Sequence, residues 1–157
     1  MAHIIPANGL LFDPDEGAEA DSYEGYLRCP CGCETFRVRH NGRLLGPLQR
    51  LWAADWFRPN GGQPLVIAAA CTGCGRETLL HCSDRDEQGW LLPASPAMQD
   101  FVHPKLHDQR VRLYVWYCWD EEPQLENGRY LTTYSLFSLA AHNNEHPGRL
   151  HIYEKTC

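Results

Sequence analysis

The chain has 157 residues, of which 43% are hydrophobic and 11% aromatic, and a formal net charge of −6 at pH 7. This length and composition predict one globular domain with a core of its own, and no apolar run approaches the roughly 20 residues of a membrane helix. The 14 basic residues are scattered without forming a basic stripe, so binding to nucleic acid or to a membrane is not expected.

The first 27 residues contain six acidic side chains and no lysine or arginine. The other 14 of the 20 acidic residues balance the 14 basic residues, so positions 28–157 are neutral. Asp13–Gly25 has neither the period of a strand nor that of a helix, which predicts a mobile loop. We therefore expect an acidic, partly mobile N-terminal arm (1–27) and a single domain (28–157). The start lacks the basic region of a signal peptide, which favours a cytoplasmic protein.

Several strands and one helix are predicted in the first half of the domain. In the segment ETFRVRHNG, Phe36 and Val38 alternate with arginines, as in a strand with one solvated face. Pro47–Phe57 places leucines and tryptophans at helical spacing behind a proline, which predicts a short helix; an apolar loop over the core explains the pattern nearly as well. Leu65–Ala70 is short and apolar, as in a buried strand, and Arg76–Cys82 reads as the next strand.

The last third of the chain predicts an antiparallel meander of three strands. Val111–Trp119 alternates between two sets of side chains, and Tyr130–His142 and Arg149–Cys157 are rich in aromatic and β-branched residues. Asn127-Gly128 favours a tight turn before the second strand. The predicted fold is mainly β with a minor helical part (α+β minor), in which cysteine-bearing β-hairpins join an antiparallel β-meander.

One face of the strand Val111–Trp119 is a possible interaction surface. It carries Arg112, Tyr114 and Trp116. Tyrosine, tryptophan and arginine are enriched in the hot spots of protein interfaces, although burial of the same face inside the protein is the simpler interpretation. Three further side chains can join this face across the meander: Tyr130, Tyr134 and Tyr153.

Five of the eight cysteines form two clusters. Cys29, Cys31 and Cys33 alternate with other residues, and Cys71 and Cys74 form a second group. In a reducing compartment, clustered cysteines are more often metal ligands than disulfides. Two thiolates separated by two residues can bind one tetrahedral Zn²⁺ from a tight turn, and a following glycine permits the positive φ that directs backbone N–H groups toward sulfur. The sequence therefore predicts a structural Cys₄ zinc site.

The first cluster leaves open which two of its cysteines bind the metal. Cys29 and Cys31 have a proline between them and a glycine after them, which favours these two together with Cys71 and Cys74. A pair that contains Cys33 is the alternative. Buried thiols without metal are a further interpretation, and so is a redox pair of Cys71 and Cys74. The redox pair is disfavoured because the following residues read as strand, whereas a helix N-terminus would lower the thiol pKa.

With these motifs, residues 27–82 resemble the zinc-ribbon family, and the segment Cys71-Thr-Gly-Cys74-Gly75 is the most specific part of the resemblance. The resemblance implies two cysteine turns at the tips of β-hairpins that hold one Zn²⁺ between them. The first turn is one residue shorter than is usual in this family, and Asn41–Pro64 is a long insertion. Zinc ribbons serve enzymes, transcription factors and ribosomal proteins, so the resemblance does not specify a function.

No catalytic motif stands out in the rest of the sequence. Two pairs of histidines spaced by four, together with an acidic turn, are interpreted as hydrogen-bonding or solvated groups: His103 and His107, His142 and His146, and Asp84, Asp86 and Glu87. The leading hypothesis is a cytosolic zinc-binding protein that acts as an interaction or accessory module for an unidentified protein partner. A small metalloenzyme with an unrecognised pocket and a nucleic-acid-binding zinc ribbon are the alternatives.

Overall fold

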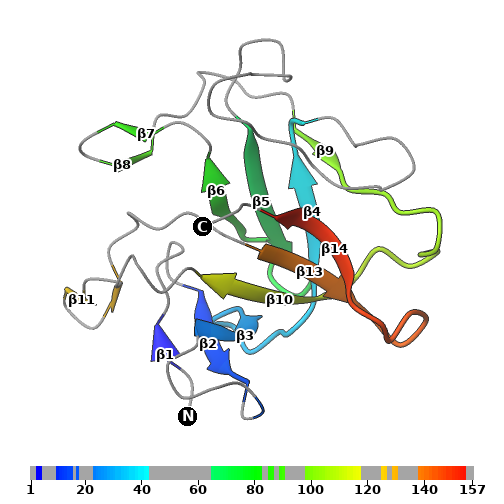
Figure 1. The fold of residues 1–157 in the computed structure, drawn as a ribbon, viewed down its shortest axis with the longest axis horizontal. Coiled ribbons are helices and arrows are strands. Elements are labelled where there is room, and N and C mark those ends of the chain that lie inside the picture. Colours follow the sequence, from blue (N-terminus) through cyan, green and yellow to red (C-terminus); the bar gives the residue numbers. More distant parts are fainter. Residues whose placement is uncertain are drawn as a thin grey trace.

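The structure is a computed structural model. It describes residues 3–4, 10–15, 17, 23–42, 65–82, 85–86, 89–90, 98–117, 125–126, 129–130 and 138–154. All regular structure in these residues is β, in antiparallel sheets of six and four strands and two short ribbons (Figure 1). The prediction of a mainly β fold is confirmed, while the predicted helix Pro47–Phe57 lies outside the described residues. Among the described residues, no helix has the length and apolar character needed to cross a membrane.

The larger sheet has the strand order β1-β2-β3-β10-β13-β14. Its strands are β1 (His3–Ile4), β2 (Leu11–Pro14), β3 (Tyr23–Arg28), β10 (Arg112–Tyr117), β13 (Ser138–His142) and β14 (Leu150–Glu154). All neighbouring strands are antiparallel. The last three strands are adjacent, as predicted for the meander, and the remaining parts of the predicted strands lie largely outside the described residues.

The acidic N-terminal region contributes strands to this sheet. The loop expected over Asp13–Gly25 is wrong at both of its ends, because β2 includes Asp13 and β3 includes Gly25. Gly25 is buried beside the ring of Phe12, and a side chain there would collide with it. The acidic groups are compatible with strand formation because they have partners, such as Arg28 Nε at 3.1 Å from the Asp13 carboxylate. The division into arm and domain stays a prediction, and its boundary falls within β3.

The smaller sheet has the order β6-β5-β4-β9. Its strands are β4 (Phe36–His40), β5 (Val66–Cys71), β6 (Glu77–Cys82) and β9 (Gln99–Asp100). In β4, Phe36 and Val38 are buried and Arg37 is exposed, as the alternation predicted. β5 is buried on both faces, as expected for a short apolar strand between two neighbours.

Two ribbons complete the described structure: β7 (Arg85–Asp86) with β8 (Gly89–Trp90), and β11 (Leu125–Glu126) with β12 (Arg129–Tyr130). β11 and β12 pair on either side of positions 127 and 128, which is the arrangement that a two-residue turn produces. The turn residues themselves lie outside the described part of the chain.

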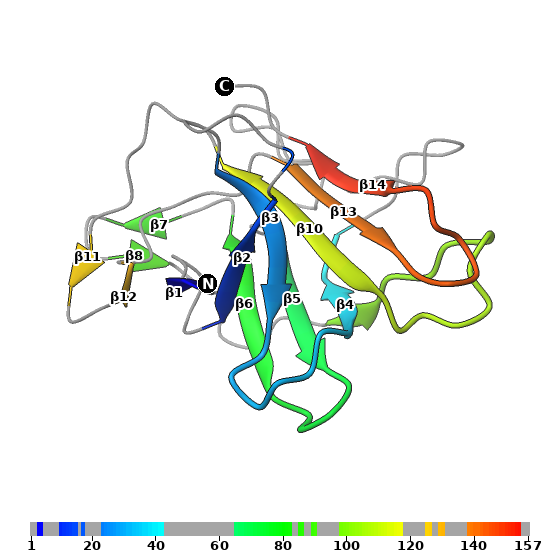
Figure 2. The same ribbon diagram turned by 90° about the horizontal axis from the view of Figure 1, so that it is seen from below.

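The two sheets pack face to face with one hydrophobic core between them (Figure 2). Side chains from both sheets are fully buried in this core: Leu27, Phe36, Ile67, Leu113, Val115, Leu139 and Ile152. The sheets also meet at one corner, where the N–H and C=O groups of Phe36 and Val111 exchange two hydrogen bonds of 2.8 and 2.9 Å. The core holds the end of β3, the start of β4 and the end of β5 close together.

The face of β10 opposite the core carries the three residues predicted as an interaction surface. Tyr114 is 8% exposed, while Arg112 and Trp116 are half-buried. The expectation that Tyr153 joins this face is wrong, because Tyr153 pairs with Leu139 and is buried in the core. Tyr134 and the side chain of Tyr130 lie outside the described residues.

Candidate metal centre

Four cysteine sulfurs converge at one end of the molecule. Cys29 and Cys31 lie in the connection from β3 to β4, Cys71 ends β5, and Cys74 lies in the turn before β6. Their Sγ atoms all lie within 4.8 Å of one another. Two of the separations are 3.7 Å between Cys29 and Cys74 and 3.5 Å between Cys31 and Cys71. Four Zn–S bonds of about 2.3 Å in a tetrahedron place the sulfurs about 3.8 Å apart, so the group has the dimensions of a zinc site.

The second cysteine turn has the backbone geometry that supports bound thiolates. The N–H groups of Gly73 and Cys74 donate to Cys71 Sγ at 3.3 and 3.5 Å. The N–H of Arg76 donates to Cys74 Sγ. Gly75 has a φ of 78°, as predicted for the glycine after the pair. These N–H donors stabilise negative charge on sulfur, which a metal ligand requires.

The first turn repeats this arrangement despite being one residue shorter. The N–H of Cys31 donates to Cys29 Sγ, and the N–H of Cys33 donates to Cys31 Sγ. Gly32 directly follows the second cysteine and has a φ of 97°. The Gly32 N–H donates to the Cys29 carbonyl at 2.8 Å, which closes the turn. The glycine after the second cysteine is thus a local signal that the two turns share.

Cys33 lies beside the four-sulfur group and outside it. Its Sγ lies 3.4 Å from Thr72 Oγ1, and Thr72 Oγ1 lies 2.6 Å from Thr35 Oγ1. A Cβ added at Gly73 would lie 3.1 Å from Cys33 Cβ, so the two turns pack closely at this point. The two threonines were not identified from the sequence, because their relation to the cysteines exists only after the turns have come together. Cys33 therefore contributes to the contact between the turns in this structure.

Burial and hydrogen bonding affect the individual thiols differently. Cys29 is 1% exposed, and burial raises the pKa of its thiol to about 12. Cys74 is exposed, and the backbone N–H of Arg76 is the main cause that lowers the pKa of its thiol to about 7. A buried thiolate at Cys29 needs a compensating positive charge, and a divalent cation at the centre of the group would supply it.

The other candidate metal ligands do not assemble. Among the described side chains, the four cysteines are the only group of three or more cysteine, histidine or acidic residues with the spacing of a metal site. The paired histidines instead make hydrogen bonds: His103 with the Lys105 N–H, His107 with Glu145, His142 with Tyr26 and His146 with the Gly148 carbonyl. Asp84 and Glu87 lie outside the described residues, and so does the side chain of Asp86.

Comparison with protein-family models, with curated proteins and with solved structures found no match for this chain. The Cys₄ group is compatible with a zinc ribbon, but only the second cysteine turn lies at the tip of a hairpin, between β5 and β6. The first turn connects two sheets, because β3 pairs with β2 and β10 whereas β4 pairs with β5 and β9. The expectation of two hairpin tips is therefore wrong for the first turn.

Proposed function

We propose that the four cysteines bind one structural Zn²⁺ and that the protein is a cytosolic protein-interaction module. The convergence of four thiols supports the metal part of the proposal. Four protein ligands fill a tetrahedral zinc ion, which leaves no position for water or substrate, and such closed sites are structural. The five described cysteine thiols are free, which is consistent with a reducing compartment.

The position of the site explains what the metal would stabilise. One cysteine turn connects the larger sheet to the smaller one, and the other lies within the smaller sheet. Figure 2 shows these two turns side by side at one end of the molecule. A metal bound by both turns would join the crossing between the sheets to the β5–β6 hairpin. It would thereby add its binding free energy to the free energy of folding.

Elemental analysis and thermal unfolding test the structural metal. We expect one zinc per chain in untagged protein and a Co²⁺ derivative with the visible spectrum of tetrahedral thiolate coordination. We also expect chelation to unfold the chain or to lower its Tm strongly, with recovery after zinc is restored. A chelated protein with an unchanged Tm would contradict a structural role for the metal.

The outer face of β10 supports the interaction part of the proposal. It combines a half-buried tryptophan and arginine with a tyrosine, and these types are frequent in interface hot spots. The test is chemical crosslinking of the protein with the proteins that co-purify with it, using Trp116→Ala. Val102→Ala is a matched control, because Val102 is a large apolar residue that is 57% exposed in another part of the fold. We expect the crosslinked partner to be lost with Trp116→Ala and retained with Val102→Ala. If both variants retain the partner, this face is excluded as the interaction surface.

A further inference from the structure

A cavity of about 540 Å³, lined by residues with polar side chains, lies beside the start of β10. The segment before this strand supplies Asp108 and Arg110, the strand supplies Arg112, and the turn between β13 and β14 supplies Glu145. His142, the last residue of β13, also lines the cavity. The volume is in the range of small-molecule sites in proteins.

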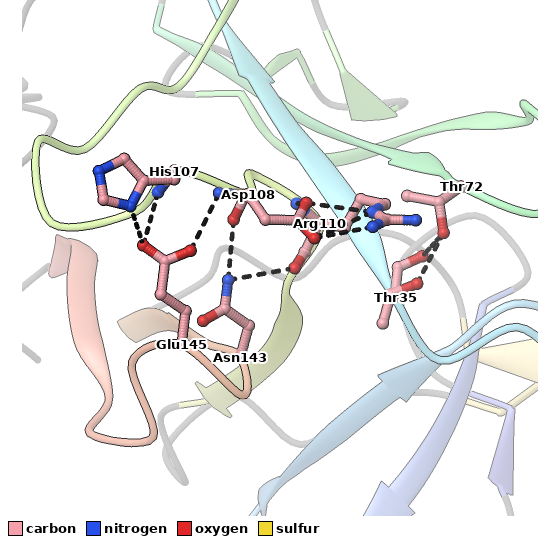
Figure 3. A network of polar contacts seen from close by, with 7 residues as sticks. All are labelled: Thr35, Thr72, His107, Asp108, Arg110, Asn143 and Glu145. Atoms are coloured by element: carbon pink, nitrogen blue, oxygen red, sulfur yellow. Dashed lines mark hydrogen bonds and ion pairs between the residues drawn. The ribbon is translucent and has the colours of Figure 1, made fainter.

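Hydrogen bonds between the two segments hold the walls of the cavity in place (Figure 3). Glu145 accepts the N–H groups of His107 and Asp108 at 2.7 and 3.2 Å. Asn143 Nδ2 donates to the Asp108 carbonyl at 2.8 Å. The cavity is therefore preformed, which reduces the entropic cost of binding a ligand.

Both carboxylates in the walls already have cationic or N–H partners. The Arg110 guanidinium contacts both oxygens of Asp108, at 2.8 Å for its closest nitrogen. This contact lowers the pKa of Asp108 to about 2. Glu145 contacts His107 Nδ1 at 2.9 Å, and the backbone N–H of His107 is the main cause of its lowered pKa. Both groups are ionised at neutral pH.

Arg112 differs from the other arginines in its surroundings. Five arginines each contact an aspartate: Arg28, Arg37, Arg39, Arg110 and Arg149. The Arg112 guanidinium instead lies 4.3 Å from the centroid of the Tyr26 ring, and its buried Nε has no hydrogen-bond partner. In the part of the chain that the structure describes, no carboxylate neutralises it. A half-buried guanidinium that lacks a carboxylate partner favours the binding of an anion beside it.

We propose that this cavity binds a small-molecule carboxylate, with Arg112 as the group that holds its charge. The guanidinium presents paired N–H donors that match the two oxygens of a carboxylate. A phosphate dianion is disfavoured because Asp108 and Glu145 place two negative charges in the same walls. The site is separate from the four cysteines and does not depend on the protein-interaction proposal.

His142 provides an independent readout of occupancy. Its Nε2 lies 3.1 Å from the Tyr26 hydroxyl, and Arg112 and Arg149 are the charged groups that act on it. Burial, and then these two arginines, lower the pKa of His142. A carboxylate bound to Arg112 reduces the repulsion of the imidazolium, so the pKa of His142 rises when the cavity is filled.

The test is an NMR titration of the zinc-loaded full chain with benzoate, at constant ionic strength set with sodium chloride. We expect saturable shifts of the Arg112 Nε–H and the His142 ring, a rise in the pKa of His142, and weaker binding of inorganic phosphate. Absence of saturation at these two residues would overturn the proposal. Tighter binding of phosphate than of benzoate would overturn the choice of a carboxylate.

Three variants define the part that Arg112 plays. Arg112→Met weakens benzoate binding about tenfold or more, and Arg112→Lys has an intermediate effect because it keeps the charge without the paired donors. Arg37→Met is the matched control, since Arg37 is an exposed arginine on the smaller sheet, and it leaves binding unchanged. If Arg112→Met fails to fold, the test uses the wild-type protein. We expect nuclear Overhauser effects between the benzoate ring protons and His142. Their absence at saturation would contradict binding in this cavity.

Discussion

Two glycines determine whether the cysteine turns can form. Gly32 and Gly75 adopt φ values of 97° and 78°, each directly after the second cysteine of its pair. A side chain there has free space, because no atom lies within 4 Å of an added Cβ. The cost of replacing either glycine is therefore backbone strain rather than a steric collision.

The first prediction concerns the glycine after the second cysteine pair. Gly75→Ala is expected to lower the free energy of unfolding of the zinc-loaded protein by about 1–2 kcal/mol, and Gly75→Asn by less, because asparagine tolerates a positive φ better. Urea denaturation measures both effects. Gly17→Ala is the control, since Gly17 is exposed, its φ lies outside the left-handed region, and an added Cβ would make only an ordinary contact of 3.5 Å with Asp15. Equal losses at the two glycines would contradict the role of φ.

Substitution of individual cysteines identifies the ligands of the first turn. Cys31→Ser is expected to reduce bound zinc below one equivalent, because the hydroxyl is a poorer ligand than the thiolate. Cys33→Ser is expected to retain one equivalent, because its hydroxyl can replace the thiol beside Thr72. Elemental analysis after dialysis against a weak chelator gives the two stoichiometries. The reverse result would make Cys33 the ligand.

The β2–β3 pair shows how an acidic segment becomes part of the larger sheet. Gly25 pairs with Pro14 on one side and with Val115 of β10 on the other, and it is buried. A Cβ at this position would lie 2.3 Å from the Asp13 carbonyl oxygen and 2.8 Å from the Phe12 ring. Only glycine allows the backbone of β2 and the Phe12 ring to approach so closely.

Gly25→Ala is therefore expected to destabilise the protein by about 1–3 kcal/mol, as overpacking does in other cores. Guanidinium denaturation measures the loss, and hydrogen exchange is expected to accelerate first in β2 and β3. Gly17→Ala, in the connection between β2 and β3, is the matched control, because its added Cβ would make only an ordinary contact of 3.5 Å with Asp15. A Gly25→Ala protein as stable as the Gly17→Ala protein would show that β2 and β3 are not paired in this way.

The folded molecule keeps several histidines in environments that oppose protonation. His40 is 2% exposed, and its Nδ1 accepts the Gly42 N–H at 3.1 Å. Burial lowers the pKa of His40, and it also lowers the pKa values of His103 and His142. The unfolded chain, with histidine pKa values of about 6.5, therefore takes up these protons at a higher pH than the folded chain does.

The stability of the protein is consequently expected to fall as the pH decreases below about 6.5 and toward the lower folded-state pKa values. His40→Gln keeps a polar side chain but removes one of the three histidines with a lowered pKa. The stability of this variant should therefore depend less steeply on pH than that of the wild-type protein between pH 7.5 and 5.5. Urea denaturation of both zinc-loaded proteins measures the two slopes, and effects of pH on the thiolates cancel in the comparison. A slope that is unchanged by His40→Gln would contradict a neutral buried His40.

Patterns of neighbouring residues along the chain were sufficient to predict the local structural features of this protein. Alternation in β4 and β10, the apolar run of β5, and the cysteine spacing with a glycine after each pair depend on neighbours within a few residues. Side-chain alternation and turn geometry are imposed by the backbone itself, so they can be read from the sequence. The mainly β fold and the two cysteine clusters were therefore predictable, whereas the sequence left open which two of the first three cysteines join the group.

The long-range arrangement depended on which strands came to lie beside one another. The pairing of β3 with β10 rather than with β4, the burial of Tyr153, and an Arg112 without a carboxylate partner all depend on residues far apart in the chain. Register and partner choice follow from the burial of whole sheet faces against a common core, and residue spacing does not encode that choice. The sequence therefore predicted a metal site built from two cysteine clusters, whereas the cavity beside β10 became visible only in the folded protein.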